Sequence, residues 1–192
     1  QRDEAYEQYD KEQAAKALPK IDKLELFLDP TKLREEITGL NEEQRQIFDD
    51  VLERINDTDI ETIPFHLFLT GAAGTGKSHV AKIINYAIRD LKKKSGQQFD
   101  KLSVLVVAPT ANAAYIIKGK TIDSALRLNI MERGYKPLQG RASSDLAEQY
   151  TDVNAISIDE ISMVGSKKHA LMNYRLQEIG ETSKNKEYFA GI

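Results

Sequence analysis

Short runs of consecutive apolar residues alternate along the chain with longer stretches in which apolar residues recur every three or four positions. The short runs are typical of buried β-strands, and the longer stretches are typical of amphipathic helices. Three short runs predict strands, at residues 65–69, 102–108 and 155–158. Strands that alternate with helices form a parallel sheet with right-handed crossovers. We therefore predict an α/β fold built on a parallel sheet.

Amphipathic helices are predicted before and after these strands in the sequence. The clearest extends from Asn41 to Ile55, because Asn41 is a good N-cap and Gln44 stands three residues later, where a capping box takes Glu or Gln. Thr121 is expected to cap another helix, directly after a turn at residues 119–121. Further helices are predicted at residues 1–17, 31–37, 78–94, 111–117 and 166–179, and a short one is predicted after a loop at 129–144, with Ser143 or Ser144 as its cap.

Composition limits the kinds of protein that this chain can be. Its 192 residues suit one main domain, and we divide them into a helical leader, 1–39, and the domain itself, 40–192. The net charge of −3 gives no overall attraction to nucleic acid, and the absence of cysteine excludes disulfides and thiolate chemistry. No apolar run is long enough to cross a membrane. The chain begins at Gln1 without an initiator methionine, which indicates a segment of a longer protein.

A glycine-rich stretch between the first predicted strand and the helix at 78–94 is the strongest chemical signal. It fits the pattern G-x-x-x-x-G-K-[ST], in which backbone N–H groups and the helix N-terminus cradle phosphates. Lys77 would contact the β- and γ-phosphates, and the Ser78 hydroxyl would bind Mg²⁺. The alternative is a glycine-rich turn with a chance lysine, but the strand and helix around it favour the phosphate loop. Its residues are Gly71, Ala72, Ala73, Gly74, Thr75, Gly76, Lys77 and Ser78.

An acidic pair follows the third predicted strand. Hydrolysis of a γ-phosphate needs a carboxylate that holds Mg²⁺ and a base that orients the attacking water. We assign Asp159 to the metal and Glu160 to the water. Such a pair alone is common and fits a solvated acidic loop. The upstream phosphate loop makes the catalytic interpretation the stronger one, because ligands of parallel sheets bind at the carboxyl ends of the strands.

Two further features have alternative interpretations on sequence alone. Gln44 fits the capping role, but its side-chain amide also suits the donor and acceptor edge of adenine. Residues 92–94 are three consecutive lysines that could contact nucleic acid. They also complement the dipole at the C-terminus of a helix that stops before Gly96, and we favour this second interpretation.

Five segments occur in an order that resembles a known family. They are residues 40–44, 71–78, 108–111, 119–126 and 158–164, and the specific ones are Ala-Pro-Thr at 108–110 and Asp-Glu-Ile-Ser-Met at 159–163. Together they resemble the first motor domain of the PIF (petite integration frequency) family, superfamily-one DNA helicases related to RecD. The resemblance covers about residues 40–192.

The resemblance implies a RecA-like fold of the P-loop NTPase class, with a three-layer parallel sheet, and ATP-driven unwinding of DNA in the 5′→3′ direction. It implies ATP and Mg²⁺ as cofactors, single-stranded DNA as partner, a monomer, and roles in DNA repair, recombination and telomere maintenance. The cell compartment would be the nucleus or mitochondrion of a eukaryote, or the cytoplasm of a bacterium or virus-infected cell. Gln44 would contact adenine, and Pro109, Thr110 and Thr121 would lie along the single strand.

The chain also departs from the family pattern. Many members carry His where this chain has Asp123, and an anion is unfavourable beside phosphates, so we do not assign Asp123 to DNA. The sequence ends before the strand that normally lies between the phosphate-loop strand and the acidic-pair strand, and before the second motor domain with its arginine finger. We therefore expect a fold that is incomplete at its C-terminal end, and a fragment that by itself neither hydrolyses ATP rapidly nor unwinds DNA.

Two other functions fit the motifs less well. One is a P-loop ATPase that acts on a partner other than nucleic acid, which the segments 108–110 and 159–163 disfavour. The other is a catalytically incomplete remnant of a mobile-element helicase that only binds DNA or protein. The intact phosphate loop argues against such a loss of function in the parent protein.

Overall fold

The computed structural model of the protein describes residues 28–56, 65–94, 102–129, 134–180 and 188–192. The predicted helix at 1–17 lies outside these residues. The elements, in chain order, are α2 (Pro30–Thr38), α3 (Glu42–Asn56), α4 (Lys77–Lys94), β1 (Val104–Ala108), α5 (Ala111–Ile116), β2 (Lys120–Thr121), α6 (Ile122–Ala125), α7 (Arg141–Tyr150), β3 (Ala155–Ile158), η2 (Ile161–Met163), α8 (Ser166–Ile179) and η3 (Tyr188–Gly191).

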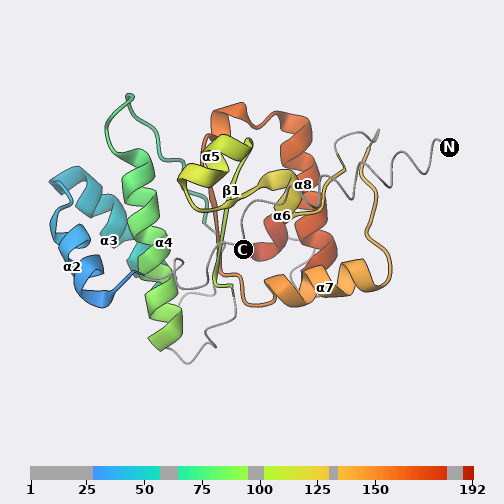
Figure 1. The fold of residues 1–192 in the computed structure, drawn as a ribbon, viewed down its shortest axis with the longest axis horizontal. Helices are drawn as coiled ribbons and strands as arrows, with labels where there is room; N and C mark the ends of the chain where they lie inside the picture. Colours follow the sequence, from blue (N-terminus) through green and yellow to red (C-terminus); the bar gives the residue numbers. More distant parts are fainter. Residues whose placement is uncertain (1–27, 57–64, 95–101, 130–133, 181–187) are drawn as a thin grey trace.

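A parallel sheet with the strand order β2-β1-β3 forms the middle layer. Alternate residues of β1 face opposite sides, as the pleat of a strand requires. Val104 and Val106 pack against α2, α3 and α4 on one side. Leu105 and Val107 pack against α6, α7 and α8 on the other. Figure 1 shows these helices on either side of β1, so the predicted three-layer α/β fold is confirmed.

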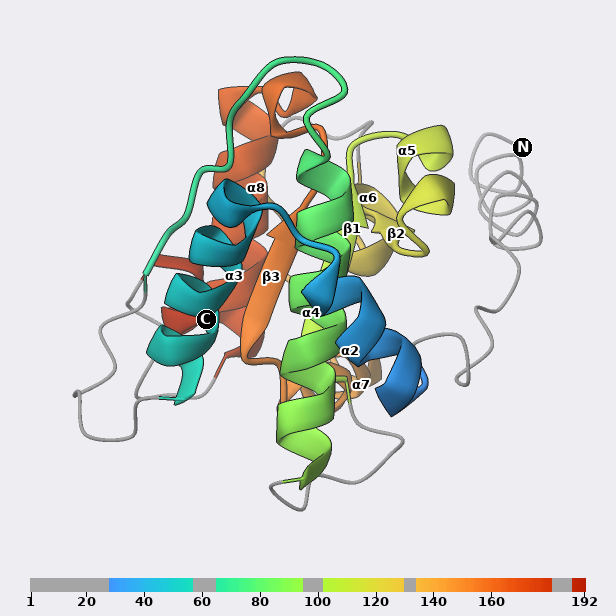
Figure 2. The ribbon, with the colours of Figure 1, turned by 90° about the vertical axis from the view of Figure 1, so that its left-hand side faces the viewer.

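The predicted strand at 65–69 is wrong. Within the described residues, 65–70 form no strand, and Leu67 and Phe68 are 56% and 70% exposed. Figure 2 shows this segment as an irregular trace that passes α3 and leads to α4. An apolar run becomes a strand only where a neighbour takes up its backbone hydrogen bonds. In the described part of the chain β3 pairs with β1 alone, so the segment has no strand beside it.

Two smaller predictions also differ from the structure. The expected turn at 119–121 contains β2, in which Lys120 and Thr121 pair with Val107 and Ala108 of β1. A Cβ at Gly119 would lie 2.5 Å from the Val106 carbonyl oxygen, so only glycine lets the chain approach β1 this closely. Helix α7 begins at Arg141, before either serine that was expected to cap it, and follows Gly140.

Several helix predictions are confirmed together with their caps. Helix α8 has the predicted range, and α2, α3 and α4 lie within one or two residues of theirs. Asn41 and Gln44 form the expected capping box at the start of α3, and the Thr121 hydroxyl accepts a hydrogen bond from the Ser124 N–H. Among the described helices, none combines the length and the apolar character needed to cross a membrane.

Candidate nucleotide-binding site

The phosphate loop joins the irregular segment 65–70 to α4 and is exposed from Gly71 to Thr75. Its side chains contact its own backbone. The Thr75 hydroxyl donates to the Ala72 carbonyl at 2.9 Å, and the Lys77 ammonium donates to the carbonyls of Gly71 and Ala72 at 2.9 and 2.8 Å. These carbonyls are accessible to water, so the ammonium group can leave them at little cost when a better anionic partner is present.

The acidic pair lies beside this loop. The Ser78 hydroxyl, in the first turn of α4, is 3.3 Å from Oδ2 and 3.4 Å from Oδ1 of Asp159, which directly follows β3. The Asp159 N–H donates to the Val107 carbonyl, which fixes this residue at the end of β1. The side-chain amide of Asn85 donates to the Ser157 hydroxyl and connects α4 with β3. The fold therefore brings together two residues that are far apart in the sequence.

A hydroxyl and a carboxylate are oxygen ligands of the kind that Mg²⁺ takes, usually with several waters and substrate phosphates as its other ligands. Ser78 and Asp159 therefore fit such an ion. Among the described residues there is no cluster of three or more His, Cys, Asp or Glu side chains that could hold a metal by themselves. The other ligands of an ion held by Ser78 and Asp159 would be waters and phosphate oxygens.

Glu160 occupies an unusual position next to Asp159. Its φ of 52° lies in the left-handed region, which costs a residue with a Cβ about 1 kcal/mol. Its N–H donates to Oδ1 of Asp159 at 3.0 Å, and its side chain is exposed. Strain of this kind concentrates at functional sites. The carboxylate of Glu160 makes no hydrogen bond or ion pair with another described residue, so it is available to a water molecule.

Gln44 combines its capping role with a contact to the phosphate loop. Its N–H donates to Oδ1 of Asn41 at 2.9 Å, and its Oε1 accepts from the Asn41 N–H at 3.2 Å. Its Nε2 also donates to the Thr75 carbonyl at 3.1 Å, a contact that the sequence did not predict. A Cβ at Gly76, whose φ is 83°, would lie 2.7 Å from that nitrogen. Capping is therefore observed, and the adenine contact stays a prediction.

The residues expected along single-stranded DNA lie at the carboxyl ends of β1 and β2. Pro109 leads from β1 to Thr110, whose hydroxyl accepts from the Ala113 N–H and caps α5. Thr121 ends β2 opposite Ala108 and caps α6. Both threonines are thus neighbours at one edge of the sheet, although their contact with DNA stays a prediction.

Asp123, which was not assigned to DNA, has a protein partner instead. Its Oδ2 is 2.7 Å from the ammonium nitrogen of Lys168 on α8. This ion pair connects α6 with the helix that follows the acidic pair and η2. The sequence did not predict it, because the two residues are far apart in the chain and neither belongs to a recognisable pairing pattern.

A buried polar network, which the sequence also did not predict, joins α8 to the loop at 134–138. Arg175 is only 3% exposed, and its guanidinium donates to the carbonyls of Leu126 and Lys136 and to Oε2 of Glu178, the last at 2.6 Å. The Leu138 N–H and the Tyr135 hydroxyl also donate to Glu178. The network therefore fastens the loop at 134–138 to α8. The spacing of Arg175 and Glu178 by three residues permits a pair on one helix face, but nothing in the sequence indicates that it is buried.

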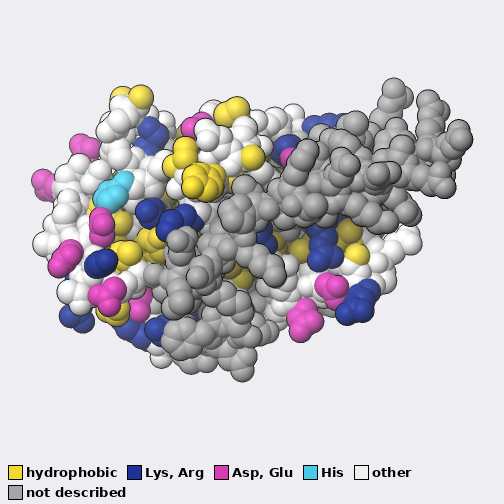
Figure 3. All heavy atoms as spheres, in the orientation of Figure 1, with side chains coloured by type: hydrophobic (Ala, Val, Ile, Leu, Met, Phe, Trp, Pro, Cys, Tyr) yellow, Lys and Arg dark blue, Asp and Glu magenta, His cyan; other side chains and the backbone are white. Residues whose placement is uncertain are grey.

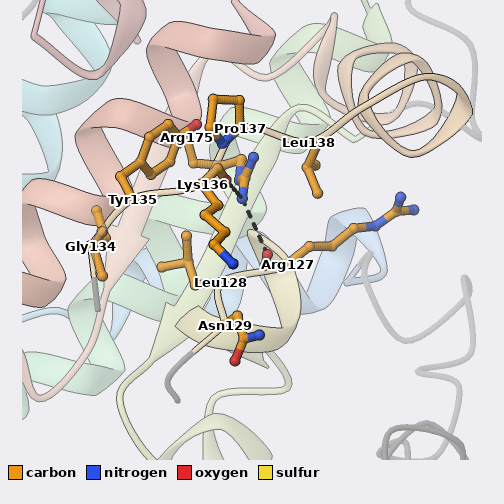
Figure 4. Close-up of a pocket in the computed structure, with 10 residues that line it drawn as sticks. Arg127, Leu128, Asn129, Gly134, Tyr135, Lys136, Pro137, Leu138 and Arg175 are labelled. Carbon is orange, nitrogen blue, oxygen red and sulfur yellow. Dashed lines mark hydrogen bonds between the residues drawn. The ribbon is translucent and has the colours of Figure 1, made fainter. Parts of the chain in front are cut away.

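The charges of this network are affected by burial. Desolvation lowers the pKa of Arg175, with Arg127 as a second, smaller cause. Burial also raises the pKa of Glu178, and the hydrogen bond from the Leu138 N–H opposes the rise. Figure 4 shows the adjoining cavity, of about 250 Å³, with Arg175 and Tyr135 in its wall. None of the predicted site residues lines this cavity.

Comparisons with known proteins identify the family of the chain. A sequence model of the family described as PIF1-like helicase matches residues 39–192. The chain is 37% identical over 101 residues to ATP-dependent DNA helicase Pif1 of Bdellovibrio bacteriovorus, a match that covers 52% of this chain and 20% of that protein. It is 33% identical over 131 residues to ATP-dependent DNA helicase RRM3 of Saccharomyces cerevisiae, which covers 66% of this chain and 16% of that protein.

A solved structure has a similar fold. It is the crystal structure of Pif1 helicase from Bacteroides in complex with ADP-AlF3 and ssDNA, with a TM-score of 0.57, 23% sequence identity, and coverage of 80% of this chain and 30% of that one. At this identity the likeness supports the fold alone. Each of these matches spans less than a third of the relative's own length. The family match extends over most of the sequence, and the chain therefore belongs to the PIF1-like helicase family.

Proposed function

We propose that the protein containing this chain is a DNA helicase that hydrolyses ATP and uses the energy to unwind DNA in the 5′→3′ direction. One observation carries the proposal: the fold brings the Ser78 hydroxyl to 3.3 Å from Asp159, beside the exposed phosphate loop. Family membership supports it. The similar proteins are named ATP-dependent DNA helicases, and the Bacteroides Pif1 structure contains ADP-AlF3 and ssDNA.

Each site residue has a chemical role in this proposal. The loop from Gly71 to Ser78 binds the phosphates of ATP through its N–H groups, and Lys77 exchanges two loop carbonyls for phosphate oxygens. Ser78 and Asp159 hold Mg²⁺, which when bound neutralises charge on the β- and γ-phosphates. Glu160 orients the attacking water and accepts its proton. Gln44 contacts adenine while it remains hydrogen-bonded to the loop.

We propose that single-stranded DNA binds at the carboxyl ends of β1 and β2. Pro109, Thr110 and Thr121 lie along its path, where phosphate contacts and stacking matter more than the reading of bases. We propose that the protein acts as a monomer inside the cell: in the nucleus or mitochondrion of a eukaryote, or in the cytoplasm of a bacterial or virus-infected cell. DNA repair, recombination and telomere maintenance are the processes that this activity would serve.

The decisive experiment uses the full-length protein that contains this chain. ATP hydrolysis is measured with and without a single-stranded oligonucleotide, and strand separation is measured on duplexes that carry either a 5′ or a 3′ single-stranded tail. We expect DNA to stimulate hydrolysis and only the 5′-tailed duplex to be unwound. Hydrolysis that DNA does not stimulate would point to a P-loop ATPase with another partner, and unwinding of the 3′-tailed duplex alone would contradict the proposed direction.

A further inference from the structure

The C-terminal end of α5 presents two large apolar side chains to solvent. Tyr115 is 68% exposed and Ile116 is 65% exposed, whereas Ala114 before them is fully buried. Figure 3 shows hydrophobic side chains gathered on the surface over α5. Neighbouring exposed apolar residues of this size mark a surface that contacts something else. Packing in the core does not require these two side chains, because the helix already packs through Ala114.

The position of the pair restricts what it contacts. Helix α5 begins after Thr110 and is followed by β2, which ends at Thr121, so the pair lies in the chain between the two proposed DNA-contacting threonines. Residues 109–122 contain two lysines, Lys118 and Lys120, and no acidic residue, in a chain whose net charge is −3. Lys120 is exposed. An aromatic ring, an aliphatic side chain and positive charge are therefore combined on one short segment.

This combination matches single-stranded nucleic acid. Unpaired bases offer flat apolar faces that stack on aromatic rings, and the connecting phosphates are negative. In a duplex those faces are already stacked on one another. A purely apolar protein partner would explain Tyr115 and Ile116 but would have no use for the lysines. Charge complementarity thus favours a single strand as the occupant.

We propose that Tyr115 is a stacking platform for an unpaired base, with Ile116 beside it and Lys120 at the adjoining phosphate. The inference rests on the proposed function and goes beyond it, because it assigns the stacking of a base to a residue other than Pro109, Thr110 and Thr121. It implies that binding depends on the presence of bases and not on their identity, since every base has a flat face.

The test compares two ligands on the full-length protein. One is a fluorescently labelled oligothymidylate, and the other is an abasic sugar–phosphate oligomer of the same length, with binding followed by fluorescence anisotropy. We expect Tyr115→Ala and Tyr115→Leu to weaken oligothymidylate binding by about 5- to 100-fold. Tyr115→Phe keeps the ring and is expected to bind normally. On the abasic oligomer all three variants are expected to match the unmodified protein.

Lys120→Ala provides the opposite pattern. It is expected to weaken the binding of both ligands. It is also expected to reduce the slope of log affinity against log salt concentration by about 0.7, since one phosphate contact is lost. Tyr174→Ala is the matched control, because Tyr174 is also an exposed tyrosine but lies on α8. We expect it to leave the binding of both ligands unchanged.

Each outcome distinguishes the inference from the proposed function. Unchanged oligothymidylate binding by Tyr115→Ala and Tyr115→Leu overturns the inference alone. An equal loss of affinity for both ligands also overturns it, because the effect of the ring would then not depend on stacking with a base. Failure of the unmodified protein to bind either ligand overturns the proposed function together with the inference.

Discussion

At the phosphate loop a half-buried lysine donates to exposed carbonyls, whereas on α8 a buried arginine donates to backbone carbonyls and a carboxylate. Lys77 donates to the carbonyls of Gly71 and Ala72, both in an exposed stretch. Arg175 donates to carbonyls of the chain and to Glu178 from a position that is 3% exposed. Water can replace the lysine at its carbonyls, but nothing replaces the arginine without leaving buried groups unpaired. The first arrangement suits a side chain that changes partners when a ligand binds, and the second suits a side chain that stabilises the fold.

The largest expected effect comes from removal of the buried cation. Arg175→Leu takes away the donor of the Leu126 carbonyl and the charged partner of the Glu178 carboxylate, which keeps only its bonds from Leu138 and Tyr135. We therefore expect the free energy of unfolding to fall by about 3–5 kcal/mol. Urea denaturation followed by circular dichroism measures the change. Arg141→Leu is the control, because Arg141 is almost fully exposed and its loss is expected to cost less than about 0.5 kcal/mol. Equal effects of the two variants would contradict the structural role of Arg175.

Removal of the Lys77 ammonium group is expected to reverse this pattern. Lys77→Ala takes away the charge that we propose contacts the phosphates, and we expect ATP turnover of the full-length protein to fall by about 10²- to 10³-fold. The midpoint of urea denaturation is expected to shift no more than it does in ordinary surface variants. Lys82→Ala, an exposed lysine on the same helix, is expected to change neither quantity. Loss of folding stability in Lys77→Ala would mean that the loop is architectural too.

The sequence predicts much of the fold for a physical reason that also explains its failures. Helices α3 and α4 have a periodic apolar face, which is a local property of the chain. Strand β2 is only two residues long, and it depends on the close approach of Gly119 to Val106. The segment 65–69 has the composition of a strand but no described strand beside it. Pairing and approach are tertiary properties that no local pattern contains.

The two polar regions differ in predictability for the same reason. The phosphate loop and Asp159 could be proposed from the sequence because phosphate and Mg²⁺ binding require fixed residue types at fixed spacing. Arg175 and Glu178 became a buried pair only because the loop at 134–138 folds over them. Burial of a charge is decided by distant parts of the chain, so this network had no signal beyond the spacing of two residues.

A buried hydroxyl gives an intermediate effect that depends on pH. The Tyr150 hydroxyl donates to the Ala125 carbonyl at 2.6 Å, and we expect Tyr150→Phe to cost about 1–2 kcal/mol at neutral pH. Burial raises the pKa of Tyr150 above its ordinary value, and Arg127 partly opposes the rise. The folded protein therefore keeps this proton at a pH where the unfolded chain loses it. Unfolding measured against pH should show a loss of stability above about pH 10 that the variant lacks.

The smallest expected effect concerns an ion pair whose burial is between those of the two regions. The Lys168 and Asp123 side chains are 27% and 16% exposed and 2.7 Å apart. A double-mutant cycle with Lys168→Met and Asp123→Asn is expected to give a coupling of about 0.5–1 kcal/mol, with weak dependence on salt.

The Arg45–Asp49 pair on α3 is the exposed reference for this cycle, with a nitrogen-to-oxygen distance of 2.9 Å. We expect a coupling of about 0.3–0.5 kcal/mol that falls as salt is added, because exposed charges are screened. The Asp123 pair should therefore exceed the reference most clearly at high salt. If both couplings fell equally with salt, burial would not be what separates a structural ion pair from an exposed one in this fold, and the contrast between Arg175 and Lys77 would need another cause.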